Sequence, residues 1–385
     1  MSDVSWSSIK QLFGDSPIFP NLRKMEWQVV EADFELGTYL HLFTPSLRTV
    51  VINCRIAFQQ IPLTQQYTDT WSARLRSLTH DLSSRVPQLT ELTFCYGGSL
   101  TTAQFSVPIS LAHFPSLRSL TLSGPTRNEL DIHDLCPLSQ LSGLESLTLG
   151  ANLTFAKQDG PGSLNPVPMT FPHLRNLVFF SPCPASSPFL VIFAAPELHS
   201  LQFNIRGAFG DLRHKCIAWP RLFPSMAFIT IYSSNTQPEY GEAPSSGEPE
   251  SIASLFAPLL QLHGIRSFSF MYYNMCFKVD DDAVATFSRS WPSLEAFSIT
   301  GHNSKGNSPR FLVGIPGLLS LAAGCPDLST LYMTRLRIDT EDIEQLRPSI
   351  PKQHSLRRLA TRGGLEPEAL RLLSDKIFPN LSVTP

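Results

Sequence analysis

The stretch Phe114–Leu122, FPSLRSLTL, contains the pattern that decides the fold of this chain. The pattern is an aromatic or apolar residue, proline, any residue, leucine, two residues, leucine, one residue and a final apolar residue. It returns as FPHLRNLVF at Phe171–Phe179 and as WPSLEAFSI at Trp291–Ile299. Such recurrence indicates a repeat protein. Further copies begin at Phe19, Thr44, Val86, Ala195, Phe223, Cys325 and Phe378, and copies without the proline contain Leu144, Ile265 and Leu356.

The spacing of the copies identifies the kind of repeat. Their first leucine-type positions lie 24 to 42 residues apart. Most of these steps fall at or just beyond the range of roughly 20–29 residues that is typical of leucine-rich repeats. The last two apolar positions of the phrase lie two residues apart, so both side chains point to one face of a strand. The proline fits just before the strand, where its missing N–H costs nothing.

Apolar residues recur with helical spacing between the predicted strands. Trp71–Leu82 and Ile252–Leu259 each place their apolar residues on one helix face. Asp280–Asp282 and Glu366–Pro367 are each expected to begin a helix, because acidic residues and proline suit the first turn. Alternating strands and helices predict an α/β leucine-rich-repeat solenoid. It would have a curved parallel sheet on the concave side and irregular helices on the convex side.

The repeats predict one continuous array, although 385 residues would otherwise suggest two or three domains. No repeat buries its own apolar face alone, so residues 19–385 are expected to form a single solenoid of about thirteen irregular repeats. Residues 1–18 are expected to be an N-terminal helical cap or a truncated linker. Residues 235–250 are rich in Pro, Gly, Ser and Glu without apolar periodicity, which predicts a mobile surface loop.

Composition and charge exclude several classes of protein. Apolar residues make up 42% of the chain, enough for a large core, and the net charge of −2 argues against a nucleic-acid-binding protein. The chain start lacks signal-peptide features, and the longest weakly polar stretch is too short to cross a membrane. The seven cysteines are widely spaced without a C-x-x-C motif. We therefore expect a cytoplasmic or nuclear protein with reduced thiols that binds neither nucleic acid nor membranes.

No combination of residues points to catalysis, a cofactor or a metal. Gly301–Gly306 resembles half of a phosphate-binding loop, but the lysine and hydroxyl residue that should follow its second glycine are missing. The adjacent carboxylates of Asp280–Asp282 cannot all converge on a cation, and they suit a helix N-terminus. The ten histidines form no metal-ligand pair, and no nucleophile elbow occurs. We expect a protein that is not an enzyme and has no cofactor and no metal site.

The concave face of the predicted sheet is the candidate binding surface. If the apolar strand positions point inward, the residues between and after them face the hollow, and these are nearly all uncharged. Aromatic residues and methionine gather there in the central and C-terminal copies, and both are favoured at protein interfaces. The opposing interpretation is that loops fold over these side chains and make them part of the core. The expected partner-binding residues are Phe180, Phe228, Tyr232, Met271, Tyr273 and Tyr332.

The repeated phrase, its irregular spacing and the loose helices resemble the leucine-rich-repeat region of fungal F-box proteins of the basidiomycete type. The likeness extends from Phe19 to Leu381. In that family an N-terminal F-box docks onto a Skp1-type adaptor of a cullin ubiquitin ligase, and the repeats recruit a substrate protein. The resemblance implies a protein-interaction scaffold similar to the substrate receptor of an SCF-type ligase. The residues before Phe19 are too few for an F-box, so adaptor binding is expected only if an F-box lies upstream.

Two other functions stay open at the level of the sequence. A parallel β-helix enzyme acting on carbohydrate also stacks coils of similar length, but it predicts little helix and carboxylates clustered on one sheet face. A GTPase-activating leucine-rich-repeat protein would bind through its repeats, and no residue here marks a catalytic arginine or asparagine. Neither alternative names a partner, so the expected partner is a protein of unknown identity.

Overall fold

The computed structural model divides the chain into two compact units. Unit 1 comprises Met1–Cys183 with Ile192–Pro196, and unit 2 comprises Pro184–Val191 with Glu197–Pro385. The expected N-terminal cap, except residue 18, and the expected loop, except residue 250, lie outside the described residues. The N-terminal cap and the mobile loop therefore stay predictions. The single solenoid of residues 19–385 also stays a prediction. The structure describes residues 18–29, 42–55, 73, 77–97, 111, 113–123, 129–150, 152–154, 169–184, 193–206, 213, 216–234, 250–273, 277–302, 310–344, 354–362 and 364–381.

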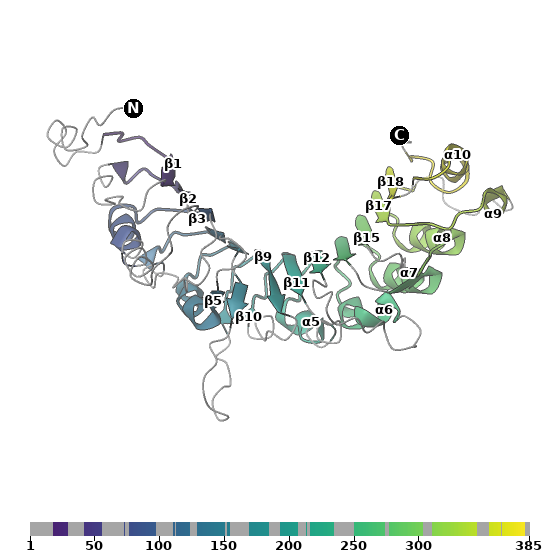
Figure 1. Cartoon of the computed structure of the whole chain (residues 1–385), viewed down its shortest axis with the longest axis horizontal. Helices are drawn as coiled ribbons and strands as arrows, with labels where there is room; N and C mark the ends of the chain where they lie inside the picture. The colour runs from purple at the N-terminus through teal and green to yellow at the C-terminus, as the bar shows by residue number, and fades with distance from the viewer. Residues whose placement is uncertain are drawn as a thin grey trace, which may run out of the picture. The chain divides into compact units, whose positions relative to one another are not determined.

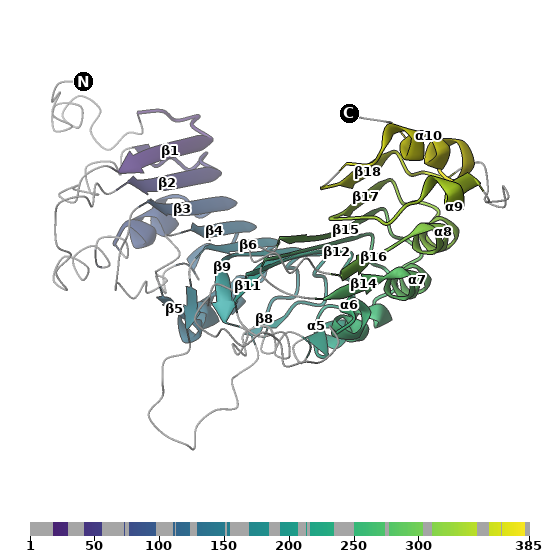
Figure 2. The same cartoon turned by 45° about the vertical axis from the view of Figure 1, so that its right-hand side comes forward.

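Unit 1 is built on parallel strands that follow the order of the sequence (Figures 1 and 2). Equivalent motif positions lie opposite one another: Leu120 faces Leu92 on the strand before it and Leu147 on the strand after it. The leucines of successive repeats therefore form continuous rows. The strands are β1 (Lys24–Val29), β2 (Thr49–Arg55), β3 (Glu91–Gly97), β4 (Ser119–Ser123), β6 (Ser146–Gly150) and β9 (Asn176–Pro184).

Several short elements are described between the strands of unit 1. Residues 77–85 are helical and bury Leu78 and Leu82, which confirms the helix predicted there, while Trp71 and Leu75 lie outside the described residues. The other connecting elements pair as short parallel ladders, β5 with β7 and β8 with β10. The connecting elements are β5 (Glu129–Asp131), the 3-10 helix η3 (Ile132–Gln140), β7 (Asn152–Thr154), β8 (Met169–Thr170) and β10 (Phe193–Ala194).

Unit 2 repeats the same arrangement of strands. Its strands pair in parallel and in register from β11 to β18, so that Ser269 lies opposite Thr230 on one side and Ser298 on the other. A second, short ladder pairs β14 with β16. The strands are β11 (Ser200–Arg206), β12 (Phe228–Ser234), β13 (Ser267–Tyr273), β14 (Lys278–Asp280), β15 (Ala296–His302), β16 (Arg310–Leu312), β17 (Thr330–Met333) and β18 (Arg358–Thr361).

Helices lie along one side of the unit 2 sheet, and no described helix lies on the other side (Figures 1 and 2). We call the side without helices the open face. The helices predicted at Asp280–Asp282 and at Glu366–Pro367 are confirmed as α7 and α10, whereas Pro258 splits the predicted Ile252–Leu259 helix into α6 and η4. The helices are α5 (Trp219–Leu222), α6 (Ile252–Leu255), η4 (Ala257–Gln261), α7 (Asp281–Ser290), α8 (Ile315–Gly324), α9 (Thr340–Glu344) and α10 (Pro367–Lys376).

The proline of the repeated phrase belongs to a tight turn that precedes each strand. The N–H of the first leucine donates to the carbonyl three residues earlier, as from Leu117 to Phe114 at 3.1 Å and from Leu294 to Trp291 at 3.1 Å. Proline therefore occupies the second turn position, where a fixed φ is favoured and its missing N–H is not needed. The sequence-based expectation placed the proline directly before the strand; in the structure Pro115 lies four residues ahead of it.

The apolar positions of the phrase form the core. Leu117, Leu120 and Leu122 are at most 3% exposed in unit 1. In unit 2 aromatic rings join this layer: the ring of Phe268 lies 5.0 Å from that of Trp291, and further rings pack around this pair. The Trp291 indole N–H donates to the Leu259 carbonyl at 3.3 Å, which satisfies its buried polar atom.

Parallel strands in register, buried leucine rows and connecting helices make this chain an α/β leucine-rich-repeat solenoid, as the sequence predicted. The helices α7, α8 and α10 disagree with the parallel β-helix alternative, which expects little helix. None of the described helices has both the length and the apolar character that a membrane crossing needs.

Candidate functional site

The open face of unit 2 consists of rows of side chains that alternate with the buried ones. On β13, Phe268, Phe270 and Tyr272 point inward and are fully buried, so Ser267, Ser269, Met271 and Tyr273 point outward. The registers of β11 to β18 align these outward positions across the unit. The rows are Ser200, Phe228, Ser267, Ala296, Thr330 and Arg358; Gln202, Thr230, Ser269, Ser298, Tyr332 and Ala360; and Asn204, Tyr232, Met271 and Thr300.

The three rows are almost free of charge. Arg358 at the sheet end is the one charged residue among their members, all of which belong to the described part of the chain. Serine and threonine hydroxyls supply most of the remaining polarity. The β-helix alternative expects clustered carboxylates on a sheet face, and these rows contain none.

Aromatic side chains interrupt the polar rows in a group that we call the aromatic face: Phe228, Tyr232, Met271, Tyr273 and Tyr332. Phe228 is 37%, Tyr273 41% and Tyr332 37% exposed, and the other two are half-buried. Tyr232 and Met271 lie directly opposite each other on neighbouring strands. Large apolar groups held on a rigid sheet and in contact with water are characteristic of binding surfaces.

Contacts within the aromatic face hold its side chains in place. The Tyr273 hydroxyl donates to the Met271 sulfur at 3.3 Å. The ring of Phe228 lies 6.1 Å from the His199 imidazole at an angle of 44°. Each side chain also stands on a strand that is paired on both sides. Binding would therefore cost little side-chain entropy.

The predicted residue Phe180 stays untested, and Tyr272 does not belong to the aromatic face. The Phe180 backbone belongs to β9 of unit 1, and its side chain lies outside the described residues, so its role stays a prediction. Tyr272, which precedes Tyr273 in the sequence, points into the core, where its ring lies 5.2 Å from those of Phe270 and Phe277. A Cβ atom at Gly301 would lie 2.5 Å from the Tyr272 ring, so glycine makes room for it.

Two polar residues of the third row escaped the sequence-based selection. Asn204 lies opposite Tyr232, and Thr300 lies opposite Met271, so the two flank the aromatic pair. The Asn204 Oδ1 and Thr300 Oγ1 atoms are buried and have no hydrogen-bond partner among the described residues. The signal available in the sequence was their motif position, which is the same as that of Tyr232.

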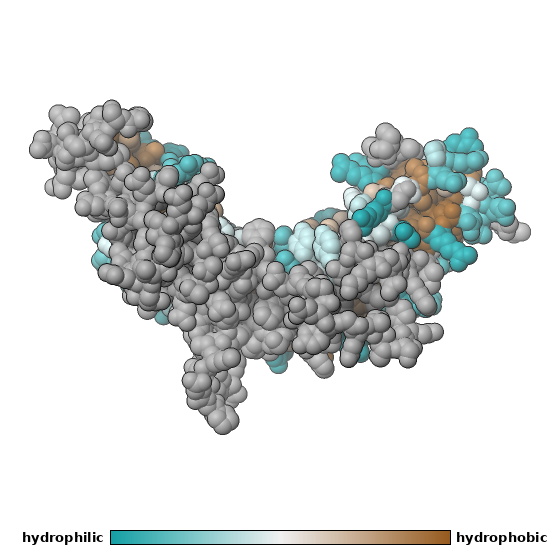
Figure 3. Space-filling view, viewed as in Figure 1, coloured by the Kyte–Doolittle hydropathy of each residue, from teal (hydrophilic) through white to brown (hydrophobic). Residues whose placement is uncertain are grey.

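An apolar area of different origin lies at the end of unit 2. Figure 3 shows brown, apolar surface near α8 and α10. There β18 is the last strand of the sheet, so its inward-pointing Leu359 is only half-buried, whereas the equivalent Leu331 on β17 is fully buried. This area reflects the end of the repeat array and does not belong to the aromatic face.

The pKa shifts of Asp280 and Cys325 arise from their places in the fold and not from a reactive site. Burial alone would raise the pKa of Asp280, but hydrogen bonds from Lys278 and from the Ala283 N–H outweigh it and lower the pKa. Asp280 thus caps α7, as expected for the acidic run. Burial raises the pKa of the Cys325 thiol to about 12, which keeps it protonated and unreactive. No group of three His, Cys, Asp or Glu residues within the described ranges could hold a metal ion.

Comparisons with known proteins add little to this description. No protein-family profile matches the chain, and no curated protein does. A protein from Bacteroides fragilis is 12% identical, covering 81% of this chain and 69% of its own, with a TM-score of 0.36. The leucine-rich repeat-containing protein LegL7 from Legionella pneumophila is 12% identical, with coverages of 93% and 99% and a TM-score of 0.34. The APL1 leucine-rich repeat domain is 13% identical, with coverages of 91% and 74% and a TM-score of 0.32.

At these TM-scores the likenesses carry no conclusion about function. The fold assignment rests on this chain's own strand registers and buried leucine rows.

Proposed function

We propose that this chain is a non-enzymatic protein-interaction scaffold whose aromatic face binds a partner protein. One observation carries the proposal: Phe228 and Tyr332 are each 37% exposed in sheet-face rows that hold a single charge, Arg358, and Tyr273 is 41% exposed beside them. Aromatic residues and methionine are enriched in the cores of protein interfaces, and charged residues are depleted there.

The mechanism is binding by a rigid surface. The strands set the ring positions in advance, so a partner does not have to order a flexible loop. Tyrosine also offers a hydroxyl for hydrogen bonding together with an apolar ring, and tyrosines are frequent among residues that dominate binding energy. We assign Tyr232 and Tyr332 as the main anchors, with Phe228 and Met271 filling the surface between and beside them.

The test begins with identification of a partner by affinity purification from the source cells and mass spectrometry. The partner is then produced in pure form and titrated calorimetrically. We expect the Tyr232→Ala/Tyr332→Ala double variant to bind at least about tenfold more weakly, since an interface hot spot contributes more than about 1 kcal/mol. Ile217→Ala is the matched control, because Ile217 is 60% exposed but does not belong to the sheet.

The control should bind as tightly as the wild type. If no stable partner is found, or if the double variant binds like the wild type, the aromatic face is not the binding site.

A narrower form of the proposal follows the resemblance to fungal F-box proteins. In that form the chain is the substrate-recognition part of an SCF-type ubiquitin ligase, and a Skp1-type adaptor binds only if an F-box lies upstream. The test is to read the genomic sequence upstream of Met1 for an in-frame F-box and to purify the endogenous protein. We expect a Skp1-type adaptor to co-purify and the partner to persist longer when the gene is deleted. Absence of both effects would contradict the ubiquitin-ligase proposal and leave the scaffold proposal intact. The GTPase-activating alternative has no described residue in its favour.

A further inference from the structure

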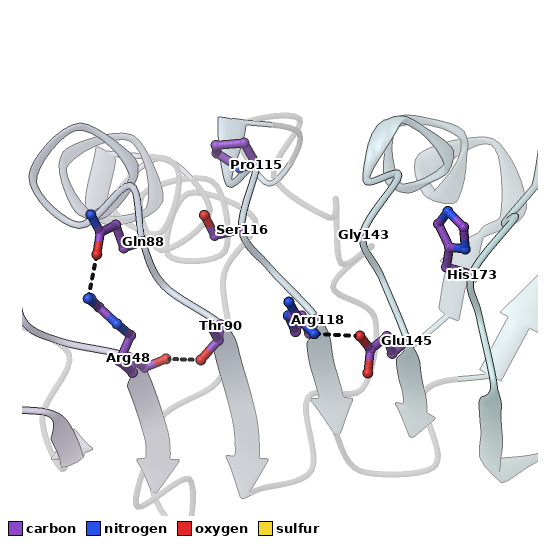
Figure 4. Close-up of a pocket in the computed structure, with 9 residues that line it drawn as sticks. All are labelled: Arg48, Gln88, Thr90, Pro115, Ser116, Arg118, Gly143, Glu145 and His173. Carbon is purple, nitrogen blue, oxygen red and sulfur yellow. Dashed lines mark hydrogen bonds and ion pairs between the residues drawn. The ribbon is translucent and has the colours of Figure 1, made fainter.

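A polar groove crosses the turns of unit 1, away from any sheet face. It encloses about 600 Å³ and is lined by residues from five consecutive repeats, each within two positions of the first leucine of its repeat (Figure 4). The residues that matter for the argument are Arg48, Gln88, Ser116, Arg118, Gly143 and His173. We propose that this groove binds extended peptide segments that carry carboxylates.

Hydrogen bonds fix the Arg48 side chain on one side of the groove. Its NH1 group donates to the carbonyls of Pro45 at 2.9 Å and Leu47 at 3.1 Å, and its NH2 group donates to the Gln88 side-chain oxygen. Figure 4 shows this pair at one end of the row of turns. An arginine already fixed in place loses little side-chain entropy when it binds an anion.

Arg118 supplies the second positive charge. Its NH1 group donates to Glu145 Oε1 at 2.8 Å in an exposed ion pair. This single bond leaves the Nε and NH2 groups of Arg118 without a hydrogen bond to any described residue. Arginine recognises carboxylates best through two parallel bonds, so the unused edge of Arg118 can still accept a ligand carboxylate.

Gly143 opens the space between Ser116 and His173. A Cβ atom added there would meet only two carbonyl oxygens, those of Leu117 at 3.8 Å and Pro115 at 3.9 Å, which are ordinary contacts. Gly143 is not one of the described glycines with a positive φ. The backbone therefore does not require glycine at this turn, and a larger residue would fit the fold while filling the groove.

The spacing of the charges suggests the form of the ligand. Arg48 and Arg118 precede strands β2 and β4, which are two places apart in the sheet. At about 4.8 Å per strand the two lie about 10 Å apart. This matches one turn, about 9 Å or three residues, of an extended polyproline II segment, whose side chains return to the same face every third residue. An acidic segment with carboxylates three residues apart would reach both. Nucleic acid is disfavoured, because Glu145 lies next to Arg118 and a nucleic-acid site needs a wider basic surface.

The inference is independent of the proposed function, because every groove residue belongs to unit 1 and every aromatic-face residue to unit 2. The probe is a fluorescein-labelled peptide, Gly-Ser-Asp-Ser-Gly-Asp-Ser-Gly, and its counterpart with Asn in place of Asp. Binding to the full chain is followed by fluorescence anisotropy at low ionic strength, where exposed charges are least screened.

We expect the acidic peptide to bind at least about tenfold more tightly than its amide counterpart, and Arg118→Ala to weaken binding by a similar factor. Gly143→Trp should abolish binding by filling the groove. Gly264→Trp is the matched control, because Gly264 occupies the same turn position in unit 2, where an added Cβ meets nothing within 4 Å. Circular dichroism and thermal unfolding verify that each variant is folded.

Equal binding of the two peptides, no binding of the acidic peptide, or equal effects of the two tryptophan variants would overturn the proposal. Displacement of the peptide by an equal concentration of inorganic phosphate would also overturn it, because the groove would then take small anions in general.

Discussion

Unit 1 and unit 2 use the same strand phrase but differ in what surrounds it. In unit 1 the described elements between the strands are a helical segment at residues 77–85, short ladders and a 3-10 helix; the core layer is largely leucine, and the polar groove lies along the turns. In unit 2 helices cover one side of the sheet, a cluster of aromatic rings joins the aliphatic core, and aromatic side chains also stand on the open face. The repeat sets the strands and turns, while the variable positions decide which surface becomes chemically distinctive.

The largest expected effect tests whether the two cores are separate. Trp291→Ala should destabilise the protein by about 3–5 kcal/mol, because it removes an indole packed against Phe268 and Phe287 and its bond to the Leu259 carbonyl. Leu120→Ala should cost about 2–5 kcal/mol in unit 1. Hydrogen exchange with mass spectrometry should localise each loss of protection to the mutated unit. Equal loss in both units after either change would mean that they unfold as one.

A feature confined to unit 2 is a carboxylate that links two helices. Asp281 of α7 accepts hydrogen bonds from the Gly314 N–H at 2.8 Å and the Gly317 N–H at 2.9 Å, at the start of α8. Asp281→Ala should cost about 2–3 kcal/mol, since bonds to a charged acceptor are lost. Asp281→Asn, which keeps one acceptor oxygen, should cost less. Urea unfolding measures both, and equal stability of the alanine variant and the wild type would refute the role.

Gly317 gives the same contact a second test. A Cβ at Gly317 would lie 2.5 Å from Asp281 Oδ1, so Gly317→Ala should also destabilise the protein, whereas Gly143→Ala in unit 1 should not.

The turn before β18 in unit 2 uses a histidine as an acceptor. The Leu356 N–H donates to His354 Nδ1 at 3.1 Å, and His354 Nε2–H donates to the Cys325 carbonyl at 3.1 Å. Burial lowers the pKa of His354, and the bond to the Cys325 carbonyl offsets part of this effect. Because the unfolded state binds this proton more readily, stability is complete above the ordinary pKa of about 6.5 and falls as the pH drops below it.

The expected slope from His354 is at most about 1.4 kcal/mol per pH unit, the value for one proton. Urea midpoints measured across this range should fall less steeply in His354→Gln than in the wild type. Identical slopes in the two proteins would show that His354 does not carry the effect.

The smallest expected effects come from two ion pairs at the same motif position. Arg118 pairs with Glu145 in unit 1, and Arg266 pairs with Glu295 in unit 2, with all four side chains well exposed. Glu145→Gln and Glu295→Gln should each change stability by less than about 1 kcal/mol. Only Glu145→Gln should strengthen the binding of the acidic peptide, because it removes a competing carboxylate from the groove. Tightening by both variants would point to a general charge effect.

Several parts of the fold could be read from the sequence because they depend on local periodicity. The alternation in Ser267–Tyr273 gave the correct inward and outward sides of β13, and the acidic run at Asp280 gave the start of α7. Other features depend on residues that are far apart in the chain. Tyr272 is buried against Gly301 of the next repeat, and Asp281 bonds to α8 of the next repeat. No local sequence pattern predicts either contact.

The sequence by itself determined the repeat, the strand register and the choice of residues with exposed rings, because a two-residue alternation and a fixed turn suffice to place them. Only the tertiary structure decided the turn groove. Its residues are separated by dozens of positions and come together because parallel strands stack equivalent turns side by side. It also showed that Gly143 leaves a gap there, since the volume of a missing side chain depends on the neighbouring repeats and not on the glycine itself.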